Sequence, residues 1–354
     1  MKRNFLYLAV LTVFAVLVMV FSSDRPSTVE QLAEPMFVPE LSAEINNVDR
    51  IEIIKAGQEE VASLRKSGDI WLLEQTGYQA DWSKLRKLLV DLAQSKVVET
   101  KTDKPEYYAR LGVEDVAAAN AASILLRLHY GEHHTAILVG HEAEGRTGRY
   151  VRLQDEAASA LIDRNIEVPT ETLQWLDSVI IDIGASEVAE VEVIHPDGEK
   201  VFVTRISADQ TDFDLVGLQQ GRELKSSWAV NSLGSVFAML EMEAVQAEQN
   251  VDWTGAVRMR LLTFSGVEII ADLVESDGTY QLRLKASHPA AAILSGQSPG
   301  SPEGDVDKQA MRDTQERVES INNKVAGWAY GIAKYKYEAI VKKTEDLLKP
   351  VATS

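Results

Sequence analysis

"VDRIEII", residues 48–54, decides the fold, because the chain contains a second copy of it. Apolar and polar residues alternate along this segment, which is typical of a β-strand with one buried face. The segment "VAEVEVI", residues 188–194, has the same alternation. The same offset along the chain aligns three further pairs: Glu59 with Glu199, Val61 with Val201, and Arg65 with Arg205. The chain therefore contains an internal duplication, and we expect two similar folded units.

The helices and hairpins of the two units align as well. Each unit has an apolar stripe at i, i+3, i+4, i+7 spacing, which predicts an amphipathic helix. The stripes consist of Leu85, Leu88, Leu89 and Leu92 and of Leu233, Val236, Phe237 and Leu240. The hairpins and following strands align Gly131 with Gly266, Ala136 with Ala271, Leu138 with Leu273, Val139 with Val274, and Leu153 with Leu284. The segment from Gly327 resembles the tryptophan-bearing strand and helix of residues 68–92, which predicts a partial third copy.

These patterns predict an α+β fold: an N-terminal transmembrane helix, two tandem antiparallel sheet-plus-helix repeat units, and a partial third closing strand-helix. Glycine, serine and proline are dense between the second unit and the C-terminal helix, which predicts a flexible loop. The expected boundaries are 1–22 for the anchor, 23–46 for a juxtamembrane tether, 47–185 and 186–286 for the repeat units, 287–305 for the loop, and 306–354 for the C-terminal helix and closing strand-helix.

The N-terminal segment predicts the cellular location. Residues Phe5 to Phe21 carry no charge and reach the lower end of the length that spans a bilayer. Lys2 and Arg3 precede them and favour a cytoplasmic N-terminus, so the rest of the chain is expected outside the cytoplasm. A cleaved signal peptide is the alternative, but the sequence before Ser23 is a weak cleavage site. We expect a single-pass protein of the inner (cytoplasmic) membrane with a periplasmic C-terminal domain.

Composition excludes several classes of partner and chemistry. The chain has 36 Lys and Arg against 54 Asp and Glu, a formal net charge of -18. This charge repels nucleic acid and anionic lipid, so we expect no nucleic-acid partner and membrane attachment only through the N-terminal helix. Cysteine is absent, which excludes disulfides, thiolate nucleophiles and cysteine-ligated zinc. We expect protein partners in the envelope.

Four histidines, His129, His133, His134 and His141, lie in the stretch "LHYGEHHTAILVGH" at residues 128–141. A two-residue turn at Gly131 and Glu132 would place His129 opposite His134 and Tyr130 opposite His133. A zinc site needs at least three protein ligands, and alternation along a strand directs His133 to the other face. The duplicate places Phe264, Glu268, Ile269 and Ser276 at the four positions. We therefore predict a structural hairpin and no metal site.

Other candidate sites favour a structural interpretation. The carboxylate pairs Asp212 with Asp214 and Glu241 with Glu243 are typical of solvated faces. Two arginines in "GRTGRY", Arg146 and Arg149, could hold an anion, but glycines there are more typical of a turn. Four aromatic residues, Trp328, Tyr330, Tyr335 and Tyr337, could form a binding platform, and packing of the last strand is the favoured alternative. The sequence predicts no catalytic and no cofactor-binding residue.

Several motifs resemble those of the bacterial domain-of-unknown-function 4340 family: "GDIWLLEQ" before an amphipathic helix, "YYARLGVED", "RYVRL", "LQWLDSVIIDI" and the closing "GWAYGIAKYKYEAIVKKTEDLL". Members of that family are often encoded beside gliding-motility-type ABC transporter components. The resemblance implies an envelope-associated, non-catalytic role, and it implies no functional residues.

Three functions remain open from sequence. The first is a membrane-anchored extracytoplasmic structural or adaptor protein of an envelope transport or motility-type assembly, without enzymatic activity. The second is an extracytoplasmic binding module that captures a ligand such as a glycan in a groove between the repeats. The third is a metal-dependent hydrolase that uses His129 and His134.

Overall fold

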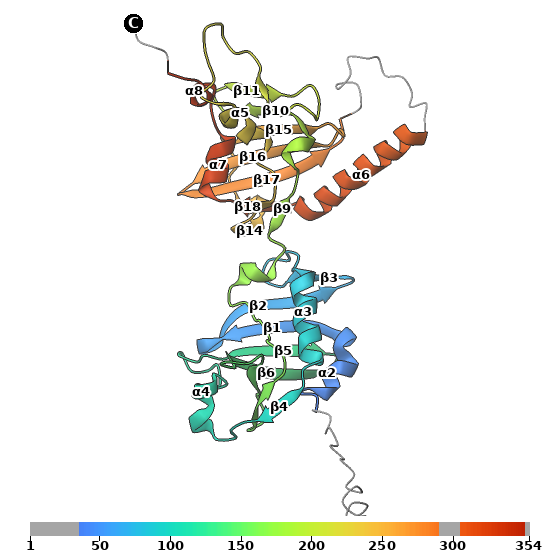
Figure 1. The fold of residues 1–354 in the computed structure, drawn as a ribbon, viewed down its shortest axis with the longest axis vertical. Coiled ribbons are helices and arrows are strands. Elements are labelled where there is room, and N and C mark those ends of the chain that lie inside the picture. Colours follow the sequence, from blue (N-terminus) through green and yellow to red (C-terminus); the bar gives the residue numbers. More distant parts are fainter. Residues whose placement is uncertain (1–34, 290–304, 351–354) are drawn as a thin grey trace, which may run out of the picture.

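The computed structural model describes residues 35–289 and 305–350 as two lobes stacked along the long axis of the molecule (Figure 1). The predicted transmembrane helix, half of the predicted tether and most of the predicted loop lie outside these residues. Within the described part of the chain, no helix has the length and apolar character to cross a membrane.

The first lobe contains an antiparallel sheet in the order β3-β2-β1-β5-β6-β7-β8-β4. Its strands are β1 (Val48–Lys55), β2 (Glu59–Ser67), β3 (Ile70–Leu73), β4 (Val97–Thr100), β5 (Ile124–Tyr130), β6 (His133–Glu142), β7 (Arg149–Leu153) and β8 (Ser159–Ile162), and its α-helices are α2 (Pro39–Glu44), α3 (Trp82–Ala93) and α4 (Tyr108–Leu111). Helix α3 lies across one face of the sheet (Figure 1). Asp81 caps it by accepting from the backbone N–H groups of Ser83 and Lys84, and its predicted leucine stripe is buried.

The second lobe contains a sheet in the order β12-β11-β10-β15-β16-β17-β18-β14. Its strands are β9 (Val179–Ile181), β10 (Val188–Ile194), β11 (Lys200–Thr204), β12 (Asp214–Leu215), β13 (Leu240–Glu241), β14 (Ala244–Ala247), β15 (Val257–Thr263), β16 (Glu268–Ser276), β17 (Thr279–Ser287) and β18 (Trp328–Gly331), and its α-helices are α5 (Ser227–Gly234), α6 (Asp305–Val325), α7 (Lys334–Ile340) and α8 (Thr344–Leu347). Strands β9 and β13 form a separate small sheet. The two large sheets have the same strand order, so the duplication extends over every strand of both.

Strand β18 corrects two of the sequence predictions. It pairs with β17 and with β14, so it is the counterpart of β8 and completes the second sheet. The predicted partial third copy is therefore wrong, and the predicted end of the second unit at residue 286 is too early. The reason is an insertion: helix α6 and the segment before it separate β17 from β18, whereas β7 and β8 are joined by a short turn.

Helix α5 is shorter than predicted. It ends at Gly234, so Val236 and Phe237 lie in the following turn and Leu240 lies in β13, although all three are buried. The N-caps give the correct alignment of the two helices, because Asp81 caps α3 and Ser226 caps α5. In this alignment the counterparts of Leu85, Leu88 and Leu92 are Val230, Leu233 and Phe237, one helical turn away from the predicted pairs.

A packed joint connects the lobes. Tyr78, which follows β3, is buried edge-on against Trp328 and Tyr330 of β18, with ring centroids 5.2 and 6.0 Å apart. Burial and the neighbouring Tyr78 raise the pKa of Tyr330. Lys324, near the end of α6, forms an ion pair of 2.7 Å with Asp177 of the segment between the lobes. Tyr330 therefore packs as part of an interior, as the sequence indicated, but its partner comes from the other lobe.

Candidate functional site

The histidine hairpin has the predicted register. Residues His129 and His134 are paired across β5 and β6, as are Tyr130 and His133, and Gly131 has the positive φ of 62° that the turn requires. The imidazole centroids of His129 and His134 lie 5.7 Å apart. Within the described ranges, no group of three or more histidine, aspartate or glutamate side chains is suited to hold a metal ion.

The counterpart hairpin aligns differently from the sequence prediction. Its turn is longer, since the N–H of Thr263 donates to the carbonyl of Val267. The pairing of both hairpins with β1 and β10 makes Leu262 the counterpart of His129 and Glu268 the counterpart of His134, in place of Phe264 and Ile269. The second lobe therefore builds this hairpin with neither histidine.

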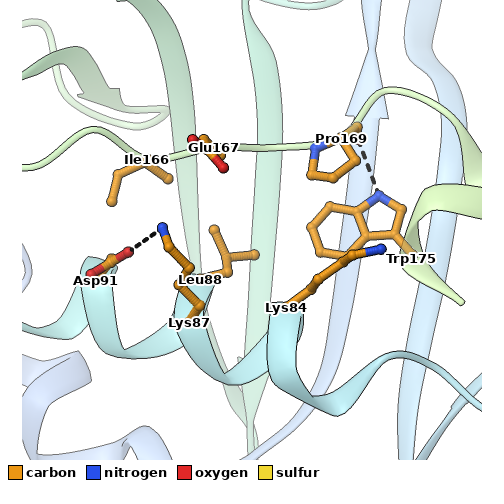
Figure 2. Close-up of a pocket in the computed structure, with 8 residues that line it drawn as sticks. All are labelled: Lys84, Lys87, Leu88, Asp91, Ile166, Glu167, Pro169 and Trp175. Carbon is orange, nitrogen blue, oxygen red and sulfur yellow. Dashed lines mark hydrogen bonds and ion pairs between the residues drawn. The ribbon is translucent and has the colours of Figure 1, made fainter. Parts of the chain in front are cut away.

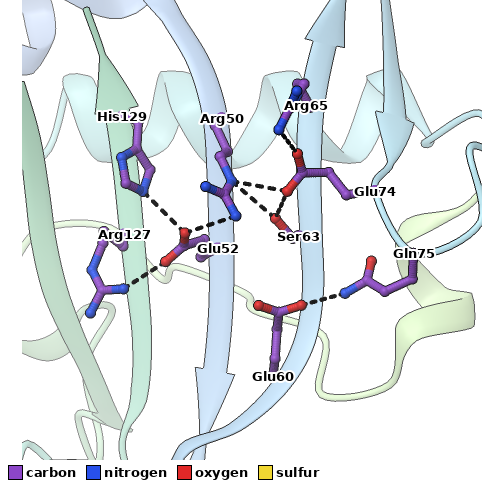
Figure 3. Close-up of polar contacts among 9 residues, drawn as sticks. All are labelled: Arg50, Glu52, Glu60, Ser63, Arg65, Glu74, Gln75, Arg127 and His129. Carbon is purple, nitrogen blue, oxygen red and sulfur yellow. Dashed lines mark hydrogen bonds and ion pairs between the residues drawn. The ribbon is translucent and has the colours of Figure 1, made fainter. Parts of the chain in front are cut away.

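His129 belongs to an ionic network on the outer face of the first sheet (Figure 3). Its centre is the buried carboxylate of Glu52, which lies 2.6 Å from Nη1 of Arg127 and 3.2 Å from Nη2 of Arg50. The Nε2 atom of His129 lies 3.4 Å from Glu52 Oε1 without forming a hydrogen bond with any described residue. Burial lowers the pKa of His129, and the opposing charge of Glu52 only partly offsets this. The imidazole is thus held neutral within a network of strand side chains.

A second candidate is the cleft between α3 and the segment that follows β8 (Figure 2). It has a volume of about 150 Å³. Both of its lysines have partners within the protein: Lys84 Nζ donates to the carbonyl of Gln174, and Lys87 pairs with Asp91. Trp175 forms one wall, and its Nε1 donates to the carbonyl of Pro169. The cleft is a small apolar depression with its lysines already engaged.

The third candidate lies on the outer face of the second sheet, where Arg258, Asp272 and Arg283 form a triad. Asp272 accepts from Nε of Arg258 at 2.7 Å and from Nε of Arg283 at 3.0 Å, and each guanidinium donates a second bond through Nη2. The guanidinium of Arg283 lies 4.6 Å from the centre of the Trp253 ring. These residues line an open groove of about 520 Å³ that continues to His195. We call it the second-lobe groove.

The charges of the triad are fixed at neutral pH. Burial alone would raise the pKa of Asp272, but the hydrogen bonds and positive charges of Arg258 and Arg283 outweigh it, so this pKa lies below its usual range. The hydrogen bond with Asp272 raises the pKa of Arg258. The triad therefore carries one positive charge in excess, and its buried carboxylate holds both guanidinium groups in place.

Sequence reasoning missed these residues. Asp272 interrupts the apolar run "EIIADLV" of β16, which is the one feature that could have indicated them. The other sequence candidates are engaged within the protein or exposed. Arg146 pairs with Glu99 at 2.9 Å, and Arg149 donates to the carbonyl of Gly140 at 2.8 Å. Asp212 accepts a hydrogen bond from Asn231, and Asp214 accepts one from Gln210. Tyr337 packs on Tyr280. The side chains of Glu241, Glu243 and Tyr335 are exposed.

A family profile described as Domain of unknown function (DUF4340) matches residues 71–252. The chain belongs to this family. The matched residues run from β3 of the first lobe, across the joint, to the segment after β14 of the second lobe. The DUF4340 region thus includes parts of both lobes, which confirms the resemblance seen in the sequence. No curated protein and no solved structure matches the chain.

Proposed function

We propose that this protein is a membrane-anchored extracytoplasmic adaptor without catalytic activity, and that it works through protein contacts in an envelope transport or motility-type assembly. The observation that supports this proposal is the joined pair of lobes. Two sheets of one topology are held end to end by Tyr78 and the Asp177–Lys324 ion pair. Such a body keeps two separate surfaces at a constant separation, which is what an adaptor requires.

The second lobe carries a surface suited to a protein partner, formed by Trp228, Met239, Tyr335, Lys336 and Lys342 on α5, α7 and the residues next to them. We call it the α5–α7 surface. The exposed fractions of Trp228, Tyr335 and Met239 are 72%, 68% and 56%. Lys342 Nζ lies 5.3 Å from the centre of the Trp228 ring, and Lys336 Nζ donates to the carbonyl of Val236 beside α5. Large exposed aromatic side chains next to cations are typical of binding hot spots.

Charge decides which partner suits this surface. The chain has a formal net charge of -18, so two lysines beside exposed aromatic rings form a local exception. Desolvation lowers the pKa of Lys342, and this cost is recovered when a negative group approaches the ammonium. The proposed partner is therefore an envelope protein that presents acidic and apolar side chains together.

Cross-linking of the full-length protein in its native membranes, followed by purification in mild detergent, tests the proposal. We expect one stoichiometric partner that is retained by wild type, lost in a Trp228→Ser, Tyr335→Ser double variant, and released as salt is raised. The matched control is Trp82→Ser, which removes an exposed tryptophan from the first turn of α3 in the other lobe. Equal capture by all three proteins, or no stoichiometric partner, would contradict the proposal.

Ligand binding is the second candidate function, and the second-lobe groove is the observation that favours it. The sequence hypothesis placed such a ligand between the repeats. The groove with the ordered arginine pair instead lies within the second lobe, on its outer sheet face.

A further inference from the structure

The two lobes can be compared position by position, because their sheets have the same topology. One cross-strand row in the first lobe runs from Ile54 of β1 through Leu125 and Leu138 to Arg152 of β7. The corresponding row in the second lobe consists of Ile194, Arg258, Asp272 and Arg283. Comparison of the two rows therefore shows which side chains are compatible with the fold of the sheet and which ones differ in the second lobe.

In the first lobe the row is part of an interior. Leu125 and Leu138 are buried in a small apolar cluster with Val116, which belongs to the connection between β4 and β5. That connection covers the outer face of the sheet: Gly57 and Gln58 donate backbone N–H bonds to the carbonyls of residues 118 and 116.

The arginine at the end of this row has a purely structural role. Arg152 is buried, and its Nε and Nη1 groups donate to backbone carbonyls, including that of Val113 at 3.0 Å. Its guanidinium lies 4.4 Å from the ring centre of Tyr108.

In the second lobe the connection that covers the outer face of the sheet is shorter, and three of the four side chains in the row are charged. The connection between β14 and β15 comprises residues 248–256, against residues 101–123 in the first lobe. It retains one element of the cover, since Trp253 stacks on Arg283 as Tyr108 stacks on Arg152. The counterparts of the two leucines are Arg258 and Asp272, and the place of the apolar cluster is an open groove.

We propose that the second-lobe groove is a binding site for an acidic sugar, whose carboxylate is held by Arg258 and Arg283. The sheet folds with leucine at the first two positions of this row in the other lobe, so the charged pair is not a requirement of the fold. Burial of the Asp272 carboxylate between the two arginines costs desolvation energy, which leucine at the same position of the first lobe does not.

The donors that remain on the guanidinium groups define the charge of the ligand. Asp272 takes bonds from Nε and Nη2 of both arginines, and within the described residues neither Nη1 group has a protein partner. A planar oxyanion fits donors of this kind, and the triad keeps one positive charge in excess. Lys285 and Glu248 line a neighbouring pocket that shares the triad, and they offset one another in charge.

The shape of the groove and its indole wall favour a sugar over a smaller anion. The groove holds about 520 Å³ and is open along its length, which suits a flat, hydroxyl-rich ring better than an enclosed apolar ligand. Trp253 is fixed by its Nε1 bond to the carbonyl of Glu248 and presents an aromatic surface at the groove. His195 also lines the groove, and its Nε2 atom lies 3.2 Å from the carbonyl oxygen of Lys342, so its Nδ1 atom is the group left for a hydroxyl of the ring.

Calorimetric titration of the purified full-length protein tests this site directly. The probes are a tetrasaccharide of galacturonic acid, its methyl ester, which removes only the charge, and acetyl-trialanine with a free carboxyl terminus. We expect the acid tetrasaccharide to bind, and the ester to bind at least about tenfold more weakly, because charge-assisted hydrogen bonds are lost. Comparable binding of the acid and the ester, or no binding of the acid, would overturn the proposal, and binding of the tripeptide alone would overturn its assignment to a sugar.

Variants at matched positions locate the site. Arg258→Leu should weaken binding of the acid tetrasaccharide at least about tenfold. The Arg258→Leu, Asp272→Leu double variant restores the pair found in the first lobe, should stay folded by circular dichroism, and should not bind. Arg260→Leu is the control, because this arginine lies on the same strand and face but pairs with Glu190 and Glu268 outside the groove. Equal losses in the Arg258 and Arg260 variants would reject the site. Neither result bears on the proposed adaptor partner, which is tested through Trp228 and Tyr335, because neither residue lines the groove.

Discussion

At the scale of single residues, His129 is a possible metal ligand by residue type, but in the structure it is a strand residue next to an ionic network. It faces His134 and approaches Glu52, but a third ligand is not placed beside them in the described structure. We predict that replacing His129 and His134 together by Gln changes the free energy of unfolding by less than about 1 kcal/mol at pH 7. We also predict purified protein without zinc. Stoichiometric zinc that disappears in the double variant would instead favour the hydrolase hypothesis.

The pH dependence of stability gives a separate test of His129. Burial lowers its pKa in the folded protein below the ordinary value of 6.5. As the pH falls through that value, the unfolded chain takes up the proton first, so the protonation of this group favours unfolding. Stability contributed by the neutral imidazole is therefore present above about pH 6.5 and is lost as the pH falls towards its folded pKa. In urea titrations from pH 7.5 to 5, His129→Gln should lose less stability than wild type, and an equal or steeper loss would show that the environment of His129 is misassigned.

At the scale of elements, the buried stripe of each helix holds it on its sheet. Leu89 of α3 is 4% exposed, and Phe237, in the turn after α5, is 0% exposed. Truncation of either side chain to Ala should cost about 2 to 5 kcal/mol through lost burial and a residual cavity. Lys87→Ala should stay within about 0.5 kcal/mol, because it removes only an exposed i, i+4 pair with Asp91. Chemical denaturation measures the stability of all three variants, and a small loss at Leu89 or Phe237 would contradict the burial of that side chain.

The same elements show what the sequence could and could not predict. Residues 48–54 and 188–194 share a partial alternation of apolar and polar side chains, and this shared pattern was sufficient to predict both strands and the duplication, because burial of one face favours that period. Helix α5 ends at Gly234, where any side chain would collide with the ring of Phe213, and an apolar stripe alone reveals neither the end of the helix nor this contact. The partners of β18 were hidden by the α6 insertion, because pairing between distant strands is a tertiary property.

The candidate site was less predictable than the fold. Arg258, Asp272 and Arg283 lie on three different strands, and no spacing within the sequence relates them. The sheet register of the two lobes makes Leu125, Leu138 and Arg152 their counterparts, and only this comparison distinguishes them from other charged strand residues. The histidines, by contrast, were close together in sequence, and that proximity overstated their proximity in space.

At the scale of the whole molecule, the predicted membrane topology is tested first. The prediction rests on Lys2 and Arg3 before the uncharged residues 5–21. A reporter enzyme that is active only outside the cytoplasm should be active when fused after Ser354. Amino-terminal sequencing of the purified protein addresses retention of the anchor. A mature chain that starts near Ser23 would favour the cleaved signal peptide, and activity of a cytoplasm-only reporter at the same position would reject the topology.

The joint determines whether the two lobes act as one body. Tyr78 is 2% exposed and fills the space between β3 of one lobe and β18 of the other, where it contacts both Trp328 and Tyr330. Tyr78→Ala should cost about 3 to 5 kcal/mol, the usual range for a large buried aromatic side chain. Because Tyr78 contacts the other lobe, much of this loss in stability should appear as weaker coupling between the unfolding of the two lobes.

Scanning calorimetry distinguishes lost coupling from a simple loss of stability. Wild type should unfold in one cooperative transition, and Tyr78→Ala should unfold in two, because each lobe retains its own eight-stranded sheet. Tyr107→Ala is the control, since this tyrosine is 38% exposed in the first lobe and lies away from the joint. A single transition at a lower temperature in Tyr78→Ala would mean that the lobes are held together mainly by the Asp177–Lys324 pair. In that case the fixed separation of the two lobes that an adaptor requires would depend on the connecting segment. Lys324→Ala would then be the variant that unfolds in two transitions.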